Sequence, residues 1–347
     1  MKRSGANVSG RSQRSAQYGV LATIAEEAGV SPATVSKVVH RRRDVAADTR
    51  AKVEELLDRH GYVRPWERPG PRQILAVFRD LSGPYTLEIT RGIVEASAEA
   101  DVDVVLGTTG RRSISQWLEE CLETDAVGLI IVISMLTEQD QRRIVDQHLP
   151  VVLIDPLRAP SLGIPSVGVT NWNGARTAVQ HLLDLGHTRI GMVAGRSHSE
   201  AGAARLHGYR AALEEAGLTY DPALVQSTDF DYAEALEATG HLLAADHPPT
   251  AIFAASDAQA LGVLEAARKH GVTVPDDLSV MSFDDTLVAS MASPPLSAMR
   301  QPFQQLGHEA MRILMNLYDG RSPGSTRIEL ATELVIRLST APLRHRA

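Results

Sequence analysis

The feature that most constrains the fold is an alternation of short apolar runs with amphipathic stretches, which begins at Ile74. The apolar runs have the length and composition of buried strands, and the stretches between them have helical periodicity. Strands that alternate with helices form mostly parallel sheets with helices on both faces. The predicted strands are Ile74–Phe78, Val102–Leu106, Gly128–Ile133, Val151–Ile154, Ile190–Ala194, Ala251–Ala254 and Leu278–Phe283.

The helical stretches also fall into two series, which we expect to form two similar, doubly wound α/β lobes. In such sheets a ligand binds beyond the carboxyl ends of the strands, so a crevice between the lobes is the expected binding place. The predicted helices are Thr86–Ala98, Ile114–Leu122, Glu138–Gln147, Gly174–Leu185, Ala203–Glu215, Ala233–Ala244 and Ala258–Lys269.

Residues 20–62 have a different, all-helical pattern. A first helix ends at Gly29, and Ser31-Pro32 supplies the N-cap and first residue of a second helix. A third helix is expected to begin near Asp48 and to end at Gly61. Two short helices joined by a glycine turn are typical of a helix-turn-helix, although a plain helical bundle has the same spacing. The predicted inner faces contain Ile24, Ala25, Ala28, Val35, Val38, Val39, Val53, Leu56 and Leu57.

Charge separates this head from the rest of the chain. Residues 1–72 hold 14 of the 35 Lys and Arg residues but 8 of the 42 Asp and Glu residues, although the whole chain has a net charge of −7. A basic head on an acidic body favours a polyanionic partner for the head. Residues 1–19 are expected to be a disordered basic arm that attracts phosphates or is simply solvated.

The remaining composition excludes several classes of protein. No signal peptide or membrane span is expected, and we predict a cytoplasmic protein. The one cysteine, Cys121, has the pattern of a buried apolar residue, so neither a disulfide framework nor a metal site or cofactor is expected. Residues 63–73 contain three prolines and are predicted to be a linker, and residues 340–347 a tail.

Two segments of the head, Val20–Val39 and Asp44–Tyr62, strongly resemble the headpiece of the lactose/galactose repressor (LacI/GalR) family. The resemblance covers about residues 20–338, because motifs in the body follow the family's order as well. These motifs are Asp80–Tyr85, Thr170-Asn171, Arg205 before Gly208-Tyr209, Ser256-Asp257, Phe283-Asp284-Asp285 and Arg300-Gln301-Pro302. The implied fold is a helix-turn-helix headpiece, residues 20–62, joined to a two-lobed, periplasmic-binding-protein-like body, residues 74–339.

The resemblance implies a transcription regulator whose headpieces bind double-stranded DNA as a homodimer, at a pseudo-palindromic operator. The second helix is expected to enter the major groove, where Lys37 donates to guanine while Pro32 and Ala33 offer apolar contact. Ser31 matches a phosphate-contacting position and also has the pattern of an N-cap, and both roles are compatible. The other positions that match phosphate contacts are Thr23, Thr34, Ser36 and His40.

The linker departs from the family pattern. Pro65, Pro69 and Pro71 disfavour the helix that usually follows the headpiece, and the segment lacks the leucine that wedges into the minor groove. Trp66, or the arginines of the segment, are alternatives for a minor-groove contact, and a solvated linker is the other interpretation. These arginines are Arg64, Arg68 and Arg72.

The family motifs also imply an effector site in the body, and its side chains suit a sugar. Hydroxyl groups both donate and accept, and the matching positions include an arginine fork, a carboxylate and two amides. Structural roles remain open for several of them: Asp257 as an N-cap, Phe230 as core, and Arg205 and Asp284 as scaffold. The expected effector-binding residues are Tyr85, Asn171, Arg205, Phe230, Asp257, Asp284 and Gln301. Asp155 also ends a strand, but the Pro156 after it departs from the family.

Three alternatives to a sugar-responsive repressor follow from the same residues. An enzyme on an α/β body would need a motif such as a phosphate loop or a nucleophile elbow, and the sequence has neither. A periplasmic binding protein would lack the headpiece. A regulator with a purine or a phosphoprotein as effector remains open, as does the choice between inducer and corepressor. Because no leucine heptad follows Arg337, we expect a dimer rather than a tetramer.

Overall fold

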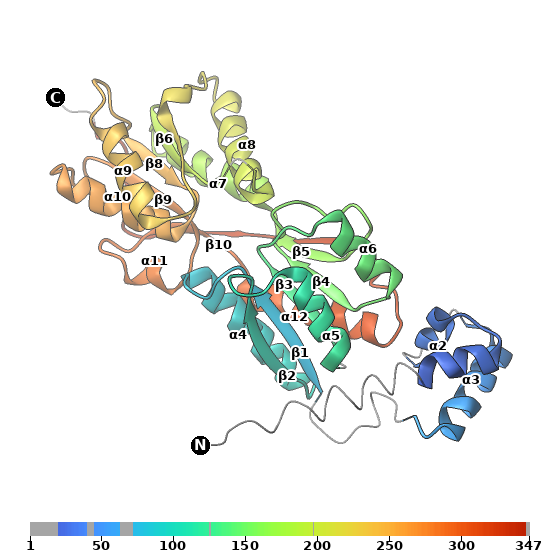
Figure 1. Ribbon diagram of the computed structural model, residues 1–347. Coiled ribbons are helices and arrows are strands. Elements are labelled where there is room, and N and C mark those ends of the chain that lie inside the picture. The colour runs from blue at the N-terminus through green and yellow to red at the C-terminus, as the bar shows by residue number, and fades with distance from the viewer. Residues whose placement is uncertain (1–19, 40–44, 63–71, 125, 197, 345–347) are drawn as a thin grey trace, which may run out of the picture.

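The computed structural model describes residues 20–39, 45–62, 72–124, 126–196 and 198–344. A helical headpiece precedes two α/β lobes, each built around its own six-stranded sheet (Figure 1). This arrangement confirms the predicted fold class. Within these ranges, no helix is both long enough and apolar enough to cross a membrane.

The headpiece folds as its apolar spacing predicts. Residues 20–28 are helical, and the turn that follows contains Gly29 with a φ of 69°. Helix α2 spans Pro32–Val39 and helix α3 spans Ala47–Arg59. Lys52 of α3 donates to the carbonyl of Ala28 over 3.0 Å and so satisfies the end of the first helix. The helices enclose a small core of Ile24, Ala25, Ala28, Val35, Val38, Val39, Val53, Leu56, Leu57 and Tyr62.

The N-lobe sheet has the strand order β11-β5-β4-β3-β1-β2, with all pairs parallel. Helices α4 (Pro84–Glu99) and α12 (Phe303–Tyr318) cover one face, and α5 (Ile114–Thr124) and α6 (Glu138–Asp146) cover the other. The strands are β1 Gln73–Phe78, β2 Asp103–Thr108, β3 Gly128–Val132, β4 Val151–Ile154, β5 Ser166–Val169 and β11 Arg327–Leu330.

The C-lobe sheet has the order β12-β10-β9-β8-β6-β7, and only its edge strand β12 runs antiparallel to its neighbour. Helices α7 (Asn171–Asp184) and α8 (Glu200–Glu215) pack on one face, and α9 (Tyr232–Leu243) and α10 (Asp257–Lys269) on the other. The remaining elements are β6 Ile190–Ala194, β7 Val225–Ser227, β8 Ala251–Ala254, β9 Ser279–Asp284, β10 Ser297–Arg300, β12 Glu333–Val335, the short helix α11 Leu287–Met291 and the 3-10 turn Pro222–Leu224.

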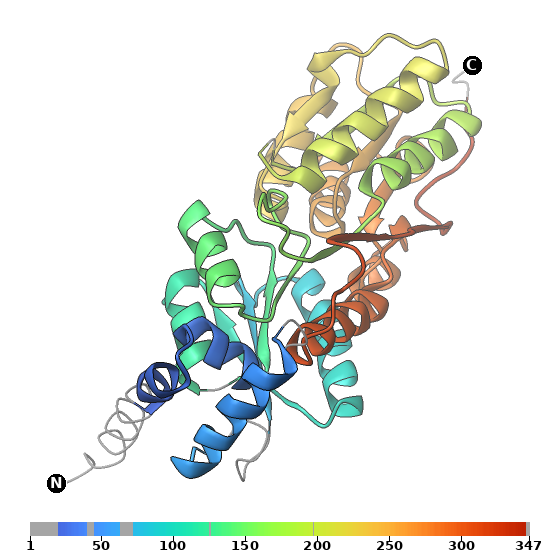
Figure 2. The ribbon, with the colours of Figure 1, turned by 90° about the vertical axis from the view of Figure 1, so that its right-hand side faces the viewer.

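The chain crosses between the lobes three times, which the two consecutive series of the sequence did not indicate. It leaves the N-lobe after β5, returns to it through α12 and β11, and enters the C-lobe again with β12 (Figure 2). All seven predicted strands are present, whereas β5, β7, β10, β11 and β12 were not predicted. These five are short, and several carry polar residues at alternate positions, so the apolar run that marks a central strand is missing.

The carboxyl ends of the parallel strands carry strained backbone. Asp155 after β4, Phe230 after β7 and Asp284 at the end of β9 have φ values of 44°, 56° and 117°. Non-glycine residues in this region cost on the order of 1–3 kcal/mol each, and such strain gathers at functional sites. The three residues belong to both lobes and line the same cavity.

Candidate functional site

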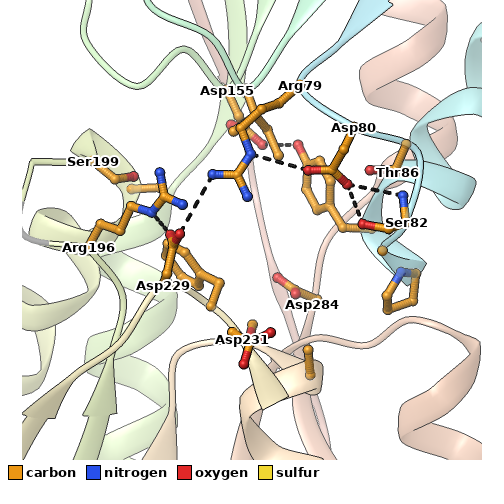
Figure 3. Close-up of a pocket in the computed structure, with 18 of the residues that line it drawn as sticks. Arg79, Asp80, Ser82, Thr86, Asp155, Arg196, Ser199, Asp229, Asp231 and Asp284 are labelled. Carbon is orange, nitrogen blue, oxygen red and sulfur yellow. Dashed lines mark hydrogen bonds and ion pairs between the residues drawn. The ribbon is translucent and has the colours of Figure 1, made fainter. Parts of the chain in front are cut away.

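A cavity of about 470 Å³ lies between the lobes, beyond the carboxyl ends of β1, β4, β6, β7, β8 and β9 (Figure 3). This is the place that the doubly wound topology predicts. Four of the seven residues expected at an effector site line it, and the other three lie behind or beside it. The four lining residues are Tyr85, Arg205, Phe230 and Asp284.

Arg205 of α8 is the buried cation of the cavity, with 5% of its surface exposed. Its Nε donates to Asn171 Oδ1 over 2.8 Å, and its Nη1 donates to the carbonyl of Ala255. The same Nη1 lies 3.5 Å from Asp284 Oδ1, and the guanidinium carbon lies 3.8 Å from the centre of the Phe283 ring. These contacts fix the plane of the fork, which leaves it ready to donate to a ligand.

Asp284 is the acceptor that faces Arg205. Gln301 donates to the same Asp284 oxygen over 2.6 Å, and burial, opposed by Arg205, raises the pKa of this carboxyl to about 7. Gln301 does not line the cavity, but its Oε1 is buried without a partner among the described residues. Gln301 therefore holds Asp284 in place, whereas Asn171 holds Arg205.

Asp257 lies behind the cavity and has no exposed surface. Its carboxylate accepts from the Ser282 hydroxyl and, over 2.6 and 2.7 Å, from the backbone and hydroxyl of Thr286. These bonds tie α10 to both sides of the strained residue Asp284. The N-cap of α10 is Ser256, whose hydroxyl accepts from Gln259 N, and Ser256 lines the cavity.

The N-lobe contributes Tyr85 and Asp155 to the opposite wall. The Tyr85 hydroxyl donates to Asp155 Oδ2 over 2.5 Å, and its ring packs edge-on against Phe303 at 5.4 Å. Burial raises the pKa values of both groups. Across the cavity, the Phe230 ring lies directly on Gly195, where any added Cβ would lie within 2.0 Å of the ring. The two aromatic rings therefore contribute apolar surface from opposite lobes.

Sequence reasoning missed most of the polar rim. Arg79 and Asp80 follow β1, Arg196 follows β6, and Asp229 follows β7 (Figure 3). A search of the first residues after each strand would have found them, except that β7 was not predicted. The other missed polar residues of the lining are Ser82, Thr86, Ser199, Asp231, Tyr232, Glu234 and Ser256.

The raised pKa of Asp284 predicts a pH dependence of stability. A carboxyl whose pKa rises from 3.8 to about 7 on folding stabilises the protein below pH 4, and that contribution is lost as pH rises to about 7. The free energy of unfolding of the wild type should therefore fall, relative to that of Asp284→Asn, as pH rises across this interval. Urea unfolding of both proteins at several pH values measures it, and a pH-independent difference would contradict the assignment.

The second site is the outer surface of the headpiece. Ser31, Pro32 and Ala33 are exposed at the start of α2, and Thr34, Ser36 and Lys37 are partly exposed along it, while Thr23 is exposed on the first helix. The valines of α2 face inward. The predicted DNA-contacting side chains of α2 therefore lie on the part of the helix that is not buried in the headpiece core. His40, residues 1–19, Arg64, Trp66 and Arg68 lie outside the described residues.

Ser31 caps α2, since its hydroxyl accepts from Thr34 N over 3.1 Å. A phosphate contact at the same residue is separable from this role, because aspartate is an equally good cap but repels phosphate. We expect Ser31→Asp to keep the thermal stability and to weaken DNA binding, whereas Ser31→Ala should lose about 1 kcal/mol of stability. Thermal unfolding and DNA titration of both variants provide the test, and unchanged DNA affinity of Ser31→Asp would rule out the phosphate contact.

Arg72 is the one linker arginine that the structure describes. Its guanidinium donates to the carbonyl of Ala100 over 2.9 Å, so it attaches the end of the linker to the N-lobe next to β1. This bond is an alternative use for a side chain that the sequence suggested for the minor groove.

Comparison with known proteins identifies the family of this chain. Residues 20–65 match the pattern described as bacterial regulatory proteins, lacI family, and residues 179–340 match a periplasmic binding protein-like domain. The transcriptional repressor CytR of Escherichia coli is 33% identical over 331 residues, which cover 92% of this chain and 96% of that protein. The regulator CelR of Thermobifida fusca is 32% identical, over 92% of this chain and 97% of that protein.

Solved structures agree over the same length. The complex of the regulator CelR with cellobiose has a TM-score of 0.70 at 31% identity and covers 92% of this chain and 99% of that one. The lac repressor dimer bound to operator and an anti-inducer has a TM-score of 0.70 at 28% identity, over 92% and 98%. Together with the headpiece and the two-lobed body, these matches show that the chain belongs to the LacI family and is a DNA-binding transcription regulator.

Proposed function

We propose that this regulator represses transcription from a pseudo-palindromic operator and that an uncharged sugar, bound between the lobes, controls its affinity for that operator. In this proposal residues 20–62 bind the DNA, residues 63–73 link this headpiece to the body, and residues 74–339 bind the effector and dimerise. The observation that carries it is the cavity itself, where a fixed arginine fork faces a carboxylate between two aromatic rings. A role in regulation, rather than catalysis, accords with the relatives.

The charges of the cavity support a neutral polyol over an anion. Six carboxyl groups but three arginines line it, so a phosphorylated or acidic ligand meets an excess of like charge. Hydroxyl groups suit this lining because each one donates to a carboxylate and accepts from an arginine. The carboxyl groups are those of Asp80, Asp155, Asp229, Asp231, Glu234 and Asp284, and the arginines are Arg79, Arg196 and Arg205. The 31%-identical regulator solved with cellobiose adds to this support.

The proposed site residues divide by role. Arg205 and Asp284 hydrogen-bond the ligand, and Tyr85 and Phe230 pack on its apolar faces, while Asn171, Asp257 and Gln301 position them. In the headpiece, Lys37 with Pro32 and Ala33 reads base edges, and the hydroxyl groups of α2 contact phosphates.

Homodimer formation is proposed from the exposed apolar side chains of the N-lobe. Leu87 and Val94 on α4, with Val105 and Leu106 on the neighbouring edge strand β2, are between 37% and 57% exposed. A cluster of this kind marks an interaction surface. Sedimentation equilibrium tests the proposal, since a monomer at micromolar concentration would exclude it.

Calorimetric titration with pentoses, hexoses, disaccharides, sugar phosphates and purines tests the choice of effector. We expect heat from an uncharged sugar and none from its phosphate ester. If a purine binds and no sugar gives a heat signal, the effector is a purine and not a sugar. The control protein is Arg210→Ala, which removes an exposed arginine from the same helix as Arg205.

A further inference from the structure

Two ion pairs join the lobes, the first at the rim of the cavity and the second outside its lining. In the first, Arg79 of the N-lobe places Nη1 3.9 Å from Asp229 Oδ2 of the C-lobe. Figure 3 shows the Arg79 side chain reaching across the cavity toward Asp229. The two residues follow β1 and β7, so this contact closes the end of the cleft where those strands end.

The second pair lies on β11 and α8. Arg327 of β11 places Nη1 2.5 Å from Glu200 Oε1, at the first residue of α8. The backbone N–H of Glu200 also donates to the carbonyl of Leu157, in the loop after β4, over 3.0 Å. Glu200 therefore holds two N-lobe segments, one through its side chain and one through its backbone.

Most of the charged partners keep a second ion pair inside their own lobe. Arg79 Nε lies 3.2 Å from Asp80, Arg327 Nη2 lies 2.7 Å from Glu329, and Asp229 pairs with Arg196. When the lobes separate, these charges remain paired and hydrated. The fourth partner, Glu200, has a side chain that is already 34% exposed. Opening therefore leaves no buried orphan charge, which is the feature that makes a contact reversible.

We infer that the pairs Arg79–Asp229 and Arg327–Glu200 form an ionic latch that sets the ratio of closed to open lobes before any ligand binds. The inference rests on the proposed function only in assigning the cleft to an effector. An exposed ion pair shifts a two-state equilibrium by at most about fivefold, so the two pairs together shift it by up to about 25-fold. A shift of this size lies within the usual range of allosteric coupling.

The latch has a consequence for the effector. A ligand that contacts Tyr85 or Asp155 of the N-lobe and Arg205 or Asp284 of the C-lobe favours the same closed state as the latch. Weakening the latch should therefore lower ligand affinity by the factor by which it lowers the closed population. Salt screens exposed charges, so the open population should also rise with ionic strength.

The test measures the distance between the lobes in full-length, ligand-free protein. Spin labels at Gln116→Cys on α5 and Glu237→Cys on α9, diluted with unlabelled protein, report it by double electron–electron resonance at about 0.05 M and about 0.5 M salt. We expect a longer distance to gain population in wild type at high salt, and in Arg79→Gln/Glu200→Gln already at low salt. Arg142→Gln, which breaks an exposed pair within α6, should behave as wild type.

Identical distance distributions of the wild type and the double variant at both salts would overturn the latch. Arg327→Gln provides a second route to the Glu200 pair, should the double variant be poorly folded by circular dichroism. Because no ligand is added, a failed effector screen leaves this result standing. Equally, a sugar that binds while the distances stay unchanged would support the proposed function and reject the latch.

Discussion

Replacing Arg205 with alanine is expected to lower ligand affinity by at least about 100-fold and to destabilise the body by about 3–5 kcal/mol. Arg205 is 5% exposed, and its guanidinium donates to Asn171 and to the carbonyl of Ala255. Its removal leaves the buried Asp284 carboxylate without a cation and two further acceptors without their donor. Calorimetry and urea unfolding measure the two losses separately.

Two control variants separate the role of the fork from that of the charge. Arg205→Lys keeps a cation near Asp284 but lacks the rigid planar fork that holds separate donors toward Asn171 and a ligand, so it should recover stability more than affinity. Arg210→Ala removes an exposed arginine from the same helix and should change neither. Wild-type ligand affinity in Arg205→Ala would show that the residue is scaffold only.

Replacing Lys37 with alanine is expected to lower the preference for operator over random DNA by about tenfold at fixed salt. Lys37 is the one charged side chain on α2, and its neighbours Pro32 and Ala33 offer apolar contact alone. Fluorescence anisotropy with both DNAs measures the ratio. Lys37→Arg should retain the preference, because the fork of arginine also donates to guanine.

An equal loss on both DNAs would instead identify Lys37 as a phosphate contact. Direct readout would then rest on apolar contacts, and most of the affinity would come from phosphates and from the spacing of the two headpieces. The salt dependence distinguishes these cases further, since loss of a phosphate contact reduces its slope by about one.

The sequence was most informative where one physical signal dominates. Continuous apolar runs such as Gly128–Val132 are buried on both faces of a parallel sheet, so all strands of this type were predicted. The edge strands β11 and β12 are exposed and polar, and their pairing depends on contacts far along the chain. Local periodicity therefore could not predict the three crossings between the lobes.

The residues of the candidate site were likewise predicted only in part. Motif order identified Arg205 and Asp284, and the structure brings them together. Motif order did not distinguish the residues that line the cavity from those that support it, because Asp257 and Ser256 are adjacent in sequence but face different surroundings. The rim residues Arg79 and Asp229 carry no motif, and only the folded cleft shows that they meet.

The central claim is that the cleft and the operator site are coupled. Its most direct test is the operator Kd, measured by anisotropy at fixed salt with and without a saturating concentration of the ligand found by calorimetry. We predict a change of at least about tenfold, together with an equal change in ligand Kd when operator is bound. An operator Kd that stays the same while the ligand is shown to be bound would contradict the claim.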